Sequence, residues 1–101
     1  MEAYEVLLSP KALRDLDAIY AYVAQTLLEE GTAAALIDAL EAGIFSLEQL
    51  PYRCPERKVG AYANKGYRQL FVKNYTVIYR IEEAKKQVII VTVVYSRRNL
   101  S

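Results

Sequence analysis

The hydrophobic pattern of the chain changes its period once, near residue 66, and this change limits the folds open to it. Between residues 10 and 50, apolar side chains recur every three or four positions, which is the spacing of amphipathic helices. Between residues 67 and 95 they form short β-branched and aromatic runs typical of strands. A chain of 101 residues has room for one hydrophobic core. We therefore expect a single domain over residues 1–101, in which helices pack on a sheet.

Two helices are predicted in the first half of the chain. Ser9 and Pro10 suit the N-cap and first position of a helix that Gly31 ends in a left-handed conformation. Its expected apolar stripe is Leu13, Leu16, Tyr20, Val23 and Leu27. A second helix opens at Thr32 and closes at Pro51, with a stripe of Leu36, Leu40, Ile44, Leu47 and Leu50. The short link between the two predicts an antiparallel helical hairpin.

Four strand-like runs complete the pattern, at residues 3–8, 67–73, 75–83 and 87–95. The last run is apolar on both faces, as is typical of a central strand that is covered on both sides. The predicted order is β-α-α-β-β-β, an α+β fold with the helical hairpin on a mostly antiparallel four-stranded sheet. We expect the first strand to lie beside the last.

The composition argues against several kinds of chemistry. The chain has no histidine, one cysteine and four scattered glycines, so it lacks the usual neutral-pH acid–base group, the usual zinc ligands and a glycine-rich phosphate loop. We therefore predict no cofactor and no metal. No apolar run approaches the roughly 20 residues that span a membrane, and the N-terminus lacks a signal-peptide pattern. The expectation is a cytoplasmic protein without a membrane partner.

Charge is divided unevenly along the chain. Residues 1–50 hold two basic and nine acidic side chains, a net charge of −7, whereas residues 51–101 hold eleven basic and three acidic ones, a net charge of +8. A basic half of this kind attracts polyanions. Arg53, Arg57 and Lys58, in the predicted loop after the helices, could steer such a partner without ordered contacts.

Two adjacent arginines, Arg97 and Arg98, follow the last predicted strand. Alternation along a strand sends their side chains in opposite directions and places Arg97 on the face of Tyr95. An arginine fork grips phosphate or carboxylate through two parallel hydrogen bonds. The residues alone are equally compatible with an anion site and with two arginines in solvent.

Three segments that span nearly the whole chain carry a family resemblance: LSPKALRDLDAIYAYV, GYRQLFVKNYTVIYRI and VIIVTVVYSRRNL. Together they resemble the RelE/ParE superfamily of bacterial type II toxins. The resemblance implies a growth-inhibiting toxin whose partner is a cognate ParD- or RelB-like antitoxin. It also implies one of two targets, because some members of the superfamily poison DNA gyrase and others cleave mRNA on the ribosome.

The resemblance assigns residues to both activities. In an mRNA endoribonuclease, Arg68 and Arg97 would stabilise the phosphate, and Tyr95 would act beside them. Leu70 and Thr76, however, stand where such nucleases tend to carry further basic residues. The ending YSRRNL is somewhat more ParE-like. This favours inhibition by binding gyrase, with mRNA cleavage, or an inactive antitoxin-binding protein, as the alternatives.

On the favoured hypothesis, a basic surface binds the macromolecular target without catalysis. Its expected members are Arg97, Arg98, Arg68, Lys73 and Arg80. Arg68 is the most telling of these, because alternation places it on the same strand face as Leu70 and Val72.

Overall fold

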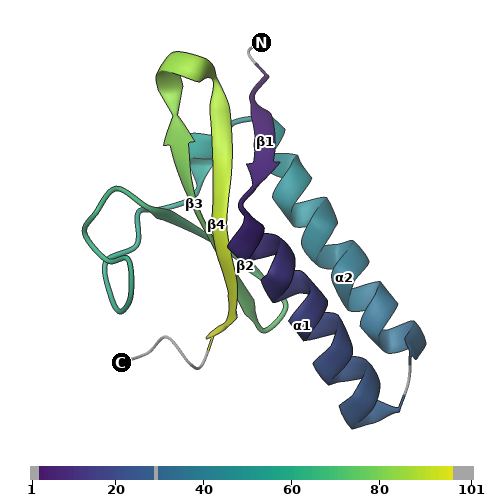
Figure 1. The fold of residues 1–101 in the computed structure, drawn as a ribbon. Coiled ribbons are helices and arrows are strands. Elements are labelled where there is room, and N and C mark those ends of the chain that lie inside the picture. The colour runs from purple at the N-terminus through teal and green to yellow at the C-terminus, as the bar shows by residue number, and fades with distance from the viewer. Residues whose placement is uncertain (1–2, 29, 97–101) are drawn as a thin grey trace.

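A computed structural model describes residues 3–28 and 30–96. Its elements are β1 (Glu5–Leu8), α1 (Pro10–Leu27), α2 (Glu30–Phe45), η1 (Ser46–Glu48), η2 (Pro51–Arg53), β2 (Arg68–Val72), β3 (Tyr75–Glu82), η3 (Glu83–Lys85) and β4 (Gln87–Tyr95). The two helices run side by side along one side of the sheet (Figure 1). The predicted order of helices and strands is confirmed.

The strands form one mixed sheet in the order β1-β4-β3-β2. β1 pairs with β4 in parallel, with Val6 opposite Val88, and this confirms that the first strand lies beside the last. β4 pairs with β3, and β3 with β2, in antiparallel fashion. The short turn at Lys73–Asn74 that the sequence predicts joins β2 to β3.

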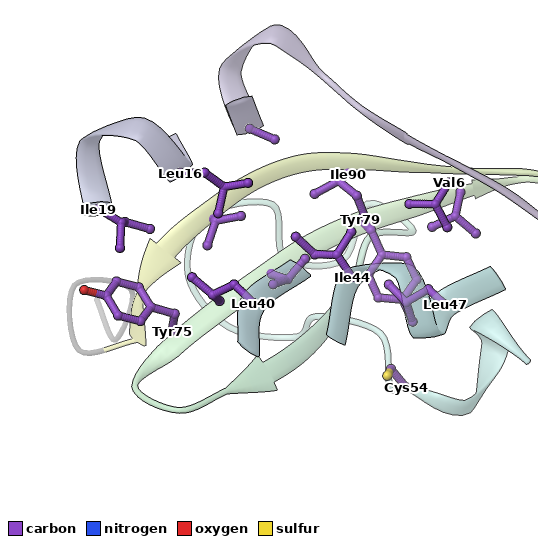
Figure 2. Packing of buried hydrophobic residues seen from close by; sticks show 14 of the residues in the cluster. Val6, Leu16, Ile19, Leu40, Ile44, Leu47, Cys54, Tyr75, Tyr79 and Ile90 are labelled. Carbon is purple, nitrogen blue, oxygen red and sulfur yellow. The ribbon is translucent and has the colours of Figure 1, made fainter. Parts of the chain in front are cut away.

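The core lies between the helical hairpin and the sheet. Leu40, Ile44 and Leu47 are fully buried and meet Tyr79 and Ile90 of the central strands (Figure 2). Ser9 caps α1 as predicted, because its Oγ accepts a hydrogen bond from the Ala12 N–H at 3.0 Å.

Close packing of α2 against the edge strand β2 depends on a glycine. A Cβ at Gly43 would lie 2.8 Å from Cγ2 of Val72, a distance that side-chain carbons do not tolerate. The missing side chain at Gly43 therefore sets how closely the helix approaches the sheet.

The buried stripe of α1 is rotated from the one that the sequence predicts. Leu16 and Val23 are buried as expected, but Leu13 is 52% exposed and Tyr20 lies at the surface. The buried set is Ala12, Leu16, Ile19 and Val23. Both sets have helical spacing, so periodicity alone does not choose between them. α1 must contact α2 and β4 at once, and this double contact selects the observed face.

The turn of the hairpin also differs from the prediction. α1 ends at Leu27, Leu28 takes the left-handed conformation with φ 54°, and α2 already begins at Glu30. Gly31 therefore lies inside α2 and does not end α1. At the other end of α2, Leu50 is 67% exposed and is not part of the apolar stripe.

Two arginines of the loop after the helices, which the sequence predicts could steer a polyanion, form hydrogen bonds within the chain. Arg57 is 5% exposed and donates hydrogen bonds to the Ala61 carbonyl at 2.5 Å and to Gln69 Oε1 at 2.8 Å. Arg53 donates to the Gln49 carbonyl at 2.8 Å, near the end of the helical segment. The loop that these contacts hold projects away from the helices (Figure 1).

Candidate functional site

Arg68 opens β2 and ties the sheet edge to the loop after α2. Its Nη1 donates to the Cys54 carbonyl at 2.6 Å and to the Tyr52 carbonyl at 3.4 Å. Its guanidinium carbon also lies 5.1 Å from the centre of the Tyr52 ring, in cation–π contact. The half-buried guanidinium is therefore engaged by the protein's own backbone and by an aromatic ring.

The carboxylate of Glu83, which is hydrogen-bonded to Tyr52 beside Arg68, holds the turn between β3 and β4. Glu83 accepts hydrogen bonds from the hydroxyls of Tyr52 at 2.7 Å and Tyr4 at 2.9 Å, and its other oxygen pairs with Lys86. Hydrogen bonds from Lys86, Tyr52 and Tyr4 lower the pKa of Glu83 from 4.5 to about 2. The bond to Glu83 in turn raises the pKa of Tyr52. These contacts join the β3–β4 turn to η2 and to the residue that precedes β1.

Arg80 lies on the opposite face of the sheet from Arg68. Arg68 is paired with Tyr79, whose ring points into the core, and the next residue along β3 must point the other way. Arg80 Nη1 forms an ion pair with Glu82 Oε2 at 2.8 Å. The two arginines therefore do not share one surface.

Tyr95 stands far from Arg68. Arg68 is opposite Tyr79 on β3, whereas Tyr95 is opposite Tyr75, four residues away along the same strand and on its other side. Four residues of strand span about 13 Å. The described residues thus do not bring the proposed catalytic pair together. Arg97 and Arg98 lie outside the described residues.

The structure does bring Tyr95 and Lys73 together, at a cavity of about 440 Å³ between the helical hairpin and the sheet. The cavity wall is mostly apolar. Its lining residues are Val23, Thr32, Ala35, Leu36, Ala39, Lys73, Asn74, Tyr75 and Tyr95. We call this space the hairpin cavity. It is the candidate binding site, because a concave apolar surface with a few polar groups is typical of sites that hold a partner side chain.

Two tyrosines and a tight turn form the sheet side of the hairpin cavity. The rings of Tyr75 and Tyr95 meet edge to face, with their centres 5.5 Å apart. The Ser96 N–H donates to the Asn74 carbonyl at 2.8 Å and so ties the end of β4 to the turn. Lys73 is exposed in that turn, and within the described ranges it forms no ion pair. Its ammonium group is available at the edge of the cavity.

Lys73 holds a backbone conformation that side chains disfavour. Its φ is 56°, in the left-handed region that glycine and asparagine adopt more readily. The two-residue turn between β2 and β3 accounts for this conformation, because such hairpin turns favour a positive φ at their first central residue.

The helix side of the hairpin cavity was not recognised from the sequence. Ala35 and Ala39 lie one helical turn apart, and their small side chains leave room that larger ones would fill. The sequence does contain a signal for this side of the cavity, the alanine-rich run TAAALIDAL, but the predicted apolar stripe includes only its leucines.

Over residues 3–28 and 30–96 no group of three or more histidine, cysteine, aspartate or glutamate side chains is arranged to hold a metal ion. In the same ranges no helix is both long and apolar enough to cross a bilayer.

Two solved structures share this two-helix, four-stranded architecture. The chromosomal ParDE toxin–antitoxin system from P. aeruginosa superposes with a TM-score of 0.76 at 20% identity, covering 92% of this chain and 96% of the other. The RelBE2 toxin–antitoxin complex from Mycobacterium tuberculosis gives a TM-score of 0.67 at 22% identity, covering 94% and 93%. The fold is thus that of the RelE/ParE toxins.

Comparison with sequence families identifies the family within this superfamily. The family described as the ParE toxin of type II toxin–antitoxin systems, parDE, matches residues 6–100. The protein therefore belongs to the ParE toxin family, and the predicted RelE/ParE membership is confirmed. A search of curated protein sequences finds no match.

Proposed function

We propose that this type II toxin arrests growth by binding its target, with DNA gyrase favoured, rather than by cleaving mRNA. The observation that carries the proposal is the separation of the residues from which a nuclease site would be built. General acid–base catalysis and phosphate stabilisation require groups within about 3 Å of the reacting atoms. Arg68 and Tyr95 stand opposite residues four positions apart on β3, on opposite sides of that strand.

The contacts of Arg68 point in the same direction. Its guanidinium donates to two backbone carbonyls of its own chain, so substituting it would disturb the loop after α2 as well as any target contact. We therefore assign target binding chiefly to Lys73, Arg97 and Arg98. Arg68 and Arg80 add to the positive potential of the basic half.

Controlled expression in a bacterial host tests the proposal. Induction should stop growth, leave mRNA intact and produce double-strand DNA breaks, because a poisoned gyrase holds cleaved DNA. Cleaved mRNA at the onset of arrest would contradict the proposal and favour the endoribonuclease. Unimpaired growth in the absence of any antitoxin would favour an inactive antitoxin-binding protein.

Variants separate the basic residues by role. Replacing Arg97 and Arg98 together by alanine should relieve growth arrest without lowering the melting temperature. The control is Arg14→Ala, which removes an arginine side chain that is exposed in the acidic half of the chain. An equal loss of toxicity in the control would show that the effect is not specific to the proposed surface.

We further propose that a cognate ParD- or RelB-like antitoxin binds this toxin through an amphipathic segment that folds on binding. The hairpin cavity would take its apolar anchors, and Lys73 would pair with a carboxylate. Opposite charge would speed the encounter, and the buried apolar contacts would set the lifetime of the complex. Both structural neighbours come from toxin–antitoxin systems, which supports this proposal.

Titration against the product of the neighbouring open reading frame tests for this partner. The expected complex survives moderate salt, because apolar burial, unlike surface charge, is not screened by ions. Absence of binding, or binding that is lost entirely at moderate salt, would contradict an antitoxin anchored in the cavity.

A further inference from the structure

β4 contains one residue more than its partner strand at the level of Val91. Ile78 of β3 lies opposite Thr92 and the next residue, Tyr79, lies opposite Ile90, so Val91 has no partner on β3. This two-against-one arrangement is a β-bulge, which leaves backbone groups unpaired and changes the direction of the strand.

The other side of the bulge faces the start of α1 rather than another strand. β1 pairs with β4 only as far as Leu8 opposite Ile90, and the chain then turns into the helix. Ser9 extends the hydrogen bonding to β4 through both its backbone N–H and its side-chain hydroxyl. Its N–H donates to the Ile90 carbonyl at 2.9 Å, and its hydroxyl donates to the Val91 carbonyl at 2.8 Å.

Asp15, further along α1, takes the place of the missing strand beyond Ser9. Its Oδ2 accepts the Val93 N–H at 3.0 Å and also accepts the hydroxyl of Thr92. Lys11 lies one helical turn earlier, and its Nζ is 3.1 Å from Asp15 Oδ1 and 3.0 Å from Thr92 Oγ1. Thr92 and Val93 are almost fully buried, so their donors depend on this carboxylate.

The bulge determines which residues near the end of β4 point toward the helices. Val88 and Ile90 point toward the helices and belong to the core, as strict alternation requires. Alternation from Ile90 without the bulge would direct Thr92 and Val94 to the core. The extra residue reverses the order, so that Val93 is buried in the core and Tyr95 packs against it. Tyr95 thus reaches the hairpin cavity because the strand carries one extra residue.

We propose that Asp15, held by Lys11, is a positioning residue that maintains the bulge and thereby keeps Tyr95 in the wall of the hairpin cavity. The carboxylate accepts the Val93 N–H and the Thr92 hydroxyl next to the bulge, on the side of β4 where β1 has ended. Asp15 touches neither the cavity nor the edge of β2. Its effect on growth arrest rests on the function proposed above, whereas its effect on the position of Tyr95 does not.

The test compares four variants of the full chain by NMR. Asp15→Asn keeps the size of the side chain but removes the negative charge that Lys11 and the two donors share. Asp17→Asn is the matched control, because this exposed carboxylate lies two residues further along the same helix. Ile19→Val controls for a general loss of stability in the same helix. Deleting Val91 removes the extra residue itself.

Two measurements report on the bulge directly. In Asp15→Asn we expect hydrogen exchange at the Val93 amide to accelerate at least tenfold relative to other core amides, and the cross-peaks between the rings of Tyr75 and Tyr95 to weaken. Deletion of Val91 should abolish those cross-peaks. Neither control variant should change them. Unchanged Val93 exchange and unchanged ring contacts in Asp15→Asn would overturn the proposal.

Growth arrest supplies the functional measurement. Asp15→Asn should weaken arrest, and Asp17→Asn should leave it unchanged. A variant that loses the Tyr75–Tyr95 contact but arrests growth as strongly as the wild type would overturn the link between the bulge and the site. Failure of the proposed function has a different signature, because it is seen in the wild type as cleaved mRNA or unimpaired growth. The ring contact then still tests the role of Asp15 by itself.

Discussion

The orientation of α1 can be tested by two leucines on the same helix. Helical spacing alone places both Leu13 and Leu16 in the core, whereas the structure buries Leu16 and leaves Leu13 52% exposed. Replacing each by alanine removes the same atoms from the same helix. The difference between the two variants therefore reports which face of α1 is buried.

The expected magnitudes follow from burial. Leu16→Ala removes buried methyl groups and leaves a cavity, which costs about 3 kcal/mol of unfolding free energy. Leu13 keeps roughly half of its side chain in water, so Leu13→Ala should cost less than about 1 kcal/mol. The slightly better helix propensity of alanine offsets part of that smaller loss.

Urea unfolding followed by circular dichroism measures both changes. With a denaturant slope of about 1.5 kcal/mol per molar, the midpoint should fall by about 2 M in Leu16→Ala and by less than about 0.7 M in Leu13→Ala. Leu16→Val serves if the alanine variant does not fold. Equal shifts in the two variants, or a larger one in Leu13→Ala, would refute the observed orientation of the helix.

Three further predictions concern single contacts. NMR titration of Glu83 should give a pKa of about 2, below the unfolded value of 4.5, because Lys86 stabilises the charged form. The contribution of Glu83 to stability is present above pH 4.5 and is lost as the pH falls toward 2. A titration midpoint near 4.5 would contradict the contacts of Glu83 with Lys86 and the two tyrosines. Tyr79→Phe should cost about 1–3 kcal/mol in thermal unfolding, because it removes the donor to the buried Pro51 carbonyl at 2.6 Å, and an unchanged melting temperature would contradict that bond. Lys73→Gly should raise stability by up to about 1 kcal/mol by relieving the left-handed backbone, yet weaken growth arrest; lower stability together with full toxicity would exclude both roles of the lysine.

Local signals in the sequence determined most of the architecture. The change from helical to alternating periodicity near residue 66 predicted the β-α-α-β-β-β order, and the structure confirms it. Ser9 was predicted as the N-cap of α1 because a hydroxyl before a proline satisfies the first free N–H groups of a helix. The turn at Lys73–Asn74 was found where two strand-like runs meet. Each of these features depends on residues close together in the chain.

The candidate site depended instead on tertiary structure. The contacts of Arg68 with the Tyr52 and Cys54 carbonyls depend on a loop whose path no local pattern encodes. Its predicted place in a shared site with Arg97 stays a prediction. Alternation read from the sequence does not reveal the bulge that directs Tyr95 toward the helices. That Arg97 shares the face of Tyr95 stays a prediction, because Arg97 lies outside the described residues.

The same limit applies to the helices. Two overlapping stripes on α1 have the same spacing, and only simultaneous packing against α2 and β4 selects Leu16 over Leu13 for the core. Asp15 has an ordinary helical position in the sequence, and its role arises because it meets Val93 across 78 positions of chain. Periodicity determines which elements form, since it reflects the geometry of one helix or strand. The face that each element buries, and the residues that meet at the site, depend on contacts between distant segments, which only the folded chain decides.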